Sequence, residues 1–162
     1  MPIDPKQTVY FKQARFTTRL PTRYLYTPSH CWLQLTEPGV YRIGLTKFAT
    51  RMLGDFVECD YHVTPRDAVS VGDVIGWIEG FKALSDIYCV AEGEFLRANE
   101  EIHTAPTLVD TDPYDRGWLY EVGGQPAENA TDVEDYTAHL NRTIERMLTA
   151  EQAQRNEDER KC

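Results

Sequence analysis

Residues Val74–Tyr88 read VIGWIEGFKALSDIY, and the rest of the chain is best interpreted outward from this stretch. The segments Val74–Phe81 and Ile87–Glu92 have the β-branched and aromatic composition that is typical of strands. Lys82 stands between them. Strand interiors avoid lysine, because an ammonium group is costly to bury without a partner. The stretch therefore predicts two strands with a break at Lys82, whose amine lies in water.

The segments on the N-terminal side of this stretch also favour a mainly β domain. Val40–Leu45 and Phe56–Asp60 have strand-like composition and rough alternation. Between them, Thr46 is a suitable N-cap and Gly54 a suitable stop for a short helix. Many short strands with intervening turns predict a sandwich or a barrel.

Composition narrows the class of protein. The 162 residues fit one domain with extensions, and no apolar run is long enough for a membrane span or a signal peptide, so we expect a cytoplasmic protein without a membrane partner. The net charge is −9, and residues 1–23 are the only segment with more basic than acidic residues, five against one. An acidic body opposes contact with phosphate backbones, so nucleic acid is not an expected partner.

Cysteine and histidine give no pattern that indicates a metal site or a catalytic centre. No C-x-x-C pair occurs and the histidines are scattered, so we expect neither bound metal nor a disulfide framework. We also find no nucleophile–base pair and no phosphate-binding loop, so we expect a protein without catalytic residues of its own. The four cysteines are Cys31, Cys59, Cys89 and Cys162.

The C-terminal segment predicts an amphipathic helix. Thr131 and Glu134 have the spacing of a capping box, with Thr131 as N-cap. An apolar stripe follows at helical spacing: Val133, Tyr136, Leu140, Ile144, Met147 and Leu148. The stripe either packs on the chain's own domain or docks a partner, and the polar residues after Glu151 are expected to fray. The predicted organisation is an extension over 1–23, a domain over 24–124 and a helical extension over 125–162.

Several motifs resemble those of the glycine cleavage system H protein family, whose members carry lipoate on a lysine. In the family's lysine hairpin a glutamate precedes the lysine by three positions, and alanine and a Ser-Asp-aliphatic-Tyr run follow it. Glu79, Lys82, Ala83 and Ser85–Tyr88 fill those places here. The resemblance extends over about residues 24–122 in three further groups of motifs: Tyr26–Trp32, Gly44–Asp55, and Asn99–Glu100 through Pro106–Val109 and Asp112–Pro113 to Gly117–Leu119.

The resemblance implies a fold, a cofactor and site residues. It implies a lipoyl-domain-like barrel-sandwich hybrid of antiparallel strands, with a hairpin turn at Lys82 and lipoate joined to Lys82 as an amide. Glu79 and Asp86 would be recognised by the lipoate-attaching enzyme, or they are ordinary acidic residues at strand ends. His30 would lie near a cleft that shelters the arm, or it is a structural residue hydrogen-bonded beneath Trp32.

Departures from the family pattern bear on the pathway. The acidic residue between the His and Trp of the family is Cys31 here, and Gly80, Phe81, Cys89 and Val90 also differ. The runs Gly76–Ala83 and Thr46–Gly54 look more similar to a branch of lipoate-binding proteins of bacterial sulfur oxidation, which predicts a shuttle of sulfur-bound intermediates with a heterodisulfide-reductase-like complex. The alternative is an aminomethyl carrier serving the glycine cleavage enzymes, including a dihydrolipoamide dehydrogenase. An unmodified interaction module that binds through the tail helix also stays open.

Overall fold

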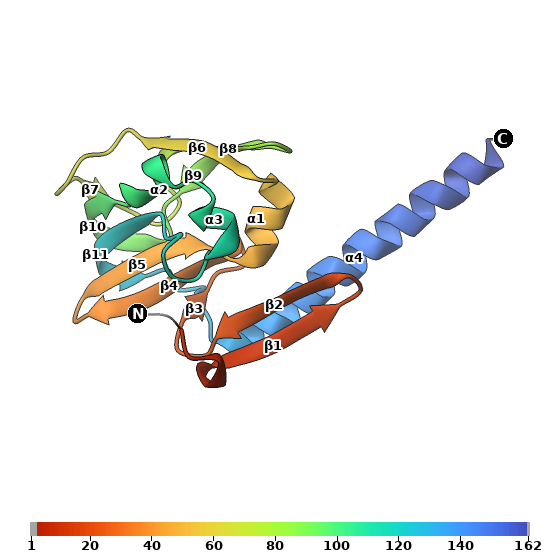
Figure 1. The fold of residues 1–162 in the computed structure, drawn as a ribbon, viewed down its shortest axis with the longest axis horizontal. Helices are drawn as coiled ribbons and strands as arrows, with labels where there is room; N and C mark the ends of the chain where they lie inside the picture. The colour runs from red at the N-terminus through yellow and green to blue at the C-terminus, as the bar shows by residue number, and fades with distance from the viewer. Residues whose placement is uncertain (1–2, 162) are drawn as a thin grey trace.

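The computed structural model describes residues 3–161 and divides them into three antiparallel sheets and five helices (Figure 1). The helices are η1 (Pro5–Gln7), α1 (Lys47–Leu53), α2 (Glu101–Thr104), α3 (Leu108–Thr111) and α4 (Val133–Arg160). The strands are β1 (Thr8–Gln13), β2 (Phe16–Pro21), β3 (Leu25–Tyr26), β4 (Cys31–Glu37), β5 (Val40–Leu45), β6 (Phe56–Tyr61), β7 (Ala68–Val69), β8 (Val74–Gly80), β9 (Leu84–Tyr88), β10 (Ala91–Ala98) and β11 (Tyr120–Pro126).

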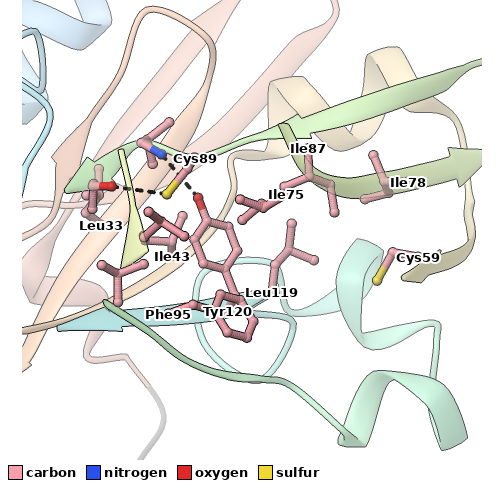
Figure 2. Close-up of a cluster of buried hydrophobic side chains, with 14 of the residues drawn as sticks. Leu33, Ile43, Cys59, Ile75, Ile78, Ile87, Cys89, Phe95, Leu119 and Tyr120 are labelled. Carbon is pink, nitrogen blue, oxygen red and sulfur yellow. Dashed lines mark hydrogen bonds between the residues drawn. The ribbon is translucent and has the colours of Figure 1, made fainter. Parts of the chain in front are cut away.

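Two of the sheets form the body of the protein. One has six strands in the order β3-β4-β5-β11-β10-β7, and the other has three in the order β6-β8-β9. Their inner faces meet in one apolar core, part of which is drawn in Figure 2 around Tyr120 and Cys89. This is a mainly β sandwich of antiparallel strands, the architecture that the strand pattern predicts and that the resemblance implies.

The β1–β2 hairpin and α4 lie side by side and share a second core (Figure 1). Aromatic and aliphatic residues from the hairpin, the body and α4 meet there; they are Phe11, Phe16, Leu20, Tyr24, Tyr26, Trp32, Phe48, Tyr114, Trp118, Val133, Tyr136, Leu140 and Ile144. Of the two alternatives for the apolar stripe, packing on the chain's own domain is therefore the one observed. Beyond the β1–β2 hairpin, the C-terminal part of α4 extends away from the body (Figure 1).

The short helix has the predicted ends. Thr46 accepts a hydrogen bond from the backbone N–H of Ala49 at 3.4 Å, and Gly54 is the C-cap with a left-handed φ of 82°. The predicted strand Ile87–Glu92 is wrong in its bounds, because β9 begins at Leu84 and ends at Tyr88. The lysine turn is tighter than composition indicates, since Leu84 pairs directly with Glu79 across the hairpin.

Two expectations for α4 are wrong. Its N-cap is Asp132, whose side chain accepts from the N–H of Asp135, while Thr131 forms a β-bridge with Tyr26. The helix also continues through the polar tail to Arg160 instead of fraying. Side-chain pairs four residues apart support that segment: Gln152 with Asn156 at 3.0 Å, Gln154 with Asp158 at 3.1 Å, and Lys161 with Glu157 at 3.7 Å.

Candidate functional site: the Lys82 hairpin and the adjoining cleft

Lys82 lies exposed in the turn between β8 and β9. The turn is closed by a 2.9 Å hydrogen bond from the N–H of Gly80 to the carbonyl of Ala83. No ion pair within the described residues 3–161 involves Lys82, so its ammonium group faces solvent. The lysine is therefore accessible for covalent modification.

The backbone of this turn is held against the C-terminal end of α1. The N–H of Lys82 donates to the carbonyl of Leu53 at 3.0 Å, and the N–H of Phe81 donates to that of Asp55 at 3.1 Å. Each such bond contributes about 0.5–1.5 kcal/mol net. Lys82 is thus an exposed residue on a turn whose backbone is hydrogen-bonded to the end of α1 and to Asp55.

Two glycines permit this close approach. A Cβ on Gly80 would lie 2.3 Å from the carbonyl oxygen of Leu53, and a Cβ on Gly54 would lie 2.8 Å from the backbone nitrogen of Lys82. Gly80 departs from the family pattern, and in this chain glycine is required there because a larger side chain would collide with Leu53. Sequence reasoning assigned Gly54 only as a helix stop and missed its contact with Lys82, because nothing local indicates that the two segments meet.

A cleft of about 480 Å³ opens beside the hairpin. It is lined by α1, β5, β8, β9 and the starts of β4 and β11. Most of its residues are apolar: Ile43, Leu45, Phe48, Ala49, Met52, Leu53, Ile78, Ala83, Ile87, Tyr88, Leu119 and Tyr120. Its polar lining is Ser29, His30, Cys31, Ser85 and Asp86. A flexible arm on Lys82 would find an apolar channel with a few polar groups at this place.

The residues predicted for the site do not all meet. Asp86 and His30 line the cleft, and Ala83, next to Lys82, lines it as well. Glu79 is exposed and does not line the cleft; it shares a second hollow on the hairpin with Trp77 and Asp86, so Asp86 borders both.

The hydrogen-bond partner of His30 lies on α4. His30 Nδ1 lies 2.8 Å from the hydroxyl of Tyr136 on α4. Trp32 instead donates its indole N–H to the carbonyls of Leu45 at 3.1 Å and Pro113 at 2.9 Å. The sequence could not reveal this contact, because 106 residues separate His30 from Tyr136.

Few charged groups line the cleft. Among the described residues that line it, Asp86 is the only carboxylate. Burial raises the pKa of the Cys31 thiol to about 11, so Cys31 is a neutral thiol at physiological pH. Burial and the neighbouring His139 lower the pKa of His30 to about 4, so its imidazole is neutral as well. An amine carried into the cleft would meet one negative charge.

Metal and membrane sites are not found in the described part of the chain. No group of three or more His, Cys, Asp or Glu side chains there could hold a metal ion. Among residues 3–161, no helix combines the length and the apolar character that crossing a bilayer requires.

Together, the fold and the hairpin define a lipoyl-type β-sandwich that presents one exposed lysine beside an apolar cleft. The family model "Glycine cleavage H-protein" matches residues 24–147. The chain belongs to this family, whose members carry lipoate covalently on a lysine. The match includes the first half of α4, whereas the resemblance in the motifs extended only to about residue 122.

Individual relatives agree with this assignment. The glycine cleavage system H protein of Psychrobacter sp. (strain PRwf-1) is 34% identical over 126 residues, which are 76% of this chain and 99% of the relative. That of Alteromonas mediterranea is 37% identical over 117 residues, 72% of this chain and 88% of the relative. The crystal structure of an H protein from Mycobacterium marinum superimposes with a TM-score of 0.67 at 29% identity, covering 75% of this chain and 99% of that one.

Proposed function

We propose that this chain is the lipoate-bearing aminomethyl carrier of a glycine cleavage system, with the lipoyl group attached to Lys82. The observation that carries the proposal is the position of Lys82: it is exposed at the tip of a hairpin that is fixed at Leu53 and Asp55 and borders the cleft. Relatives named glycine cleavage system H protein support this pathway. None of the comparisons supports the sulfur-oxidation branch that the hairpin residues had favoured.

The residues present fit the lipoyl group. The side chain of Lys82 has no ion pair to break among the described residues, and the apolar lining of the cleft suits a hydrocarbon arm. When attached, the lipoyl group would supply a dithiol that holds the carried carbon on sulfur. The chain itself is proposed to supply no catalytic group.

The roles of the chain's own residues follow from the geometry. Asp86 would attract the amine end of the cargo, and the neutral side chains of Cys31 and Ser29 would surround it without adding charge. Glu79 and Asp86 would also contact the lipoate-attaching enzyme, because both are exposed on the strands that flank Lys82. Further proposed partners are the glycine-decarboxylating enzyme, the folate-dependent transferase and a dihydrolipoamide dehydrogenase of the cytoplasm.

Intact mass spectrometry tests the attachment site. The protein is incubated with lipoate, ATP and a lipoate ligase, and one lipoyl amide is expected on the wild type and on Lys12→Arg, an exposed lysine on β1. Lys82→Arg is expected to stay unmodified while keeping its thermal unfolding midpoint. Modification of Lys82→Arg, or none of the wild type, would overturn the proposal. Loading of the arm by glycine and the decarboxylase, against loading by sulfane sulfur donors, then separates the two pathways.

A further inference from the structure

The β1–β2 hairpin has one apolar face and one basic face. The residues of these strands that pack into the second core are Phe11, Phe16 and Leu20. Successive side chains of a strand point to opposite faces, so the residues between them lie on the outer face. They include two cross-strand pairs of exposed residues, Tyr10 with Arg19 and Lys12 with Thr17. The guanidinium of Arg19 lies over the ring of Tyr10, 5.3 Å from its centroid.

The charge of this hairpin is opposite to that of the chain as a whole. Residues 1–23 hold five of the 17 basic residues and only one of the 26 acidic ones. Arg15 stands at the hairpin turn, and Arg51 reaches over from α1, with its guanidinium 5.9 Å from the ring centroid of Phe16. We call the exposed residues Lys12, Arg15, Arg19 and Arg51 the basic surface. No ion pair within residues 3–161 involves any of the four, so their charge is available to a partner.

The basic surface adjoins the lysine hairpin through α1 (Figure 1). Arg51 contacts Phe16, and Leu53, two residues later, accepts the 3.0 Å hydrogen bond from the N–H of Lys82. Because α1 has seven residues, it is about 10 Å long. An ordinary protein interface covers about 800 Å² of each partner. An interface centred on Lys82 therefore extends over Arg51 and toward the tip of the β1–β2 hairpin.

The lysine hairpin and the basic surface differ in charge. Three exposed carboxylates, those of Asp55, Glu79 and Asp86, accompany the Lys82 turn. Attachment of lipoate turns the ammonium group of Lys82 into a neutral amide, which leaves the carboxylates unopposed. Complementary charge steers the encounter of two proteins and fixes the orientation in which they dock. A partner with positive charge opposite the lysine hairpin and negative charge opposite the basic surface is therefore held in one orientation.

We propose that the basic surface is a docking site for a carboxylate-rich patch beside the active-site entrance of an enzyme that receives the Lys82 arm. This inference rests on the proposed function and gives the chemistry of the partner. A protein fits better than a nucleic acid or an anionic membrane, because the remainder of the chain is acidic and repels an extended polyanion. Salt screens charges beyond about 8 Å at physiological ionic strength, so a local patch of carboxylates meets the basic surface without that repulsion.

Binding of the unmodified protein tests the surface without the lipoyl group. The glycine decarboxylase, the folate-dependent transferase and the dihydrolipoamide dehydrogenase are each titrated by calorimetry. The test variant combines Lys12→Gln, Arg15→Gln and Arg19→Gln. The control variant combines Arg146→Gln, Arg155→Gln and Arg160→Gln, which are exposed residues of α4. Both variants lower the net charge equally, so a difference between them reports the position of the charges.

For at least one of these enzymes, the test variant should bind about tenfold more weakly than the control variant at low ionic strength, and added salt should reduce the difference. Arg51→Gln alone should weaken binding of the same enzyme about twofold, and it leaves the β1–β2 hairpin unchanged should the test variant fail to fold. Equal affinities of the test and control variants for every enzyme would overturn the inference. Tighter binding of a DNA duplex or of phosphatidylserine vesicles than of any enzyme would also overturn it.

Steady-state turnover separates this inference from the proposed function. With lipoylated carriers, the test variant should raise the KM of the same enzyme for the carrier severalfold and leave kcat unchanged, because the basic surface contacts the partner and not the arm. An equal KM for the test and control variants would refute the inference and leave the carrier function intact. Absence of turnover with the lipoylated wild type would refute the carrier function itself.

Discussion

The contact between Gly54 and Lys82 gives a prediction in which backbone strain and contact can be separated. Gly54→Ala places a Cβ 2.8 Å from the backbone nitrogen of Lys82 and 2.9 Å from its Cγ, at a residue whose φ is 82°. The left-handed conformation costs alanine about 1 kcal/mol. Displacing the turn also weakens the Lys82-to-Leu53 hydrogen bond, worth about 0.5–1.5 kcal/mol. The total loss of stability is about 1.5–2.5 kcal/mol.

Gly39 offers a matched control. It has a similar φ of 76°, and a Cβ there would have no heavy atom within 4 Å, so Gly39→Ala has the strain without the contact. At about 2–4 °C per kcal/mol for a chain of this size, the thermal unfolding midpoint should fall by about 3–10 °C for Gly54→Ala and by about 2–4 °C for Gly39→Ala.

The functional readout for this pair of variants is lipoylation by a ligase. Gly54→Ala should lower kcat/KM for attachment severalfold, because the turn that presents Lys82 is no longer held in place. Gly39→Ala should be modified at the wild-type rate. Equal shifts in unfolding temperature and equal lipoylation rates for the two variants would refute the argument that Gly54 positions the turn.

Three other perturbations have expected outcomes. Burial lowers the pKa of His30 to about 4 from an ordinary 6.5, so between these pH values the unfolded chain binds more protons than the folded one. The free energy of unfolding should therefore fall by up to about 3 kcal/mol as the pH drops from 6.5 to 4. Denaturant titrations at each pH should show a smaller fall for His30→Gln. Leu140→Ala in the second core should cost about 2–5 kcal/mol in the same assay, whereas Leu148→Ala, 43% exposed, should change stability by less than about 0.5 kcal/mol. The side chain of Phe81 is 81% exposed, so Phe81→Ser should leave the unfolding midpoint unchanged. It should raise the KM of the decarboxylase for the carrier severalfold, because an exposed aromatic side chain is a typical contact at an interface. An unchanged KM would argue against a contact at Phe81.

Much of the fold was predictable because its signals are local. Thr46 and Gly54 mark the ends of α1 by capping chemistry, and the apolar spacing from Val133 onward predicted α4. The bounds of β9 and the continuation of α4 to Arg160 were not predicted. The bounds of β9 depend on pairing across the hairpin, and the C-terminal part of α4 depends on side-chain contacts four residues apart. Residue propensities alone do not predict such contacts.

For the proposed site, the residues around Lys82 were enough to predict the lysine. Lys82 is set among residues whose types and spacing are recognisable without coordinates, and a charged side chain at a strand break lies in water for electrostatic reasons. The surroundings of Lys82 could be read only from the folded chain: the contacts at Gly54 and Gly80, the cleft, and the hydrogen bond between His30 and Tyr136, which are 106 residues apart. Local chemistry is encoded in neighbouring residues, whereas these contacts arise only when the burial of two separate cores brings distant segments together.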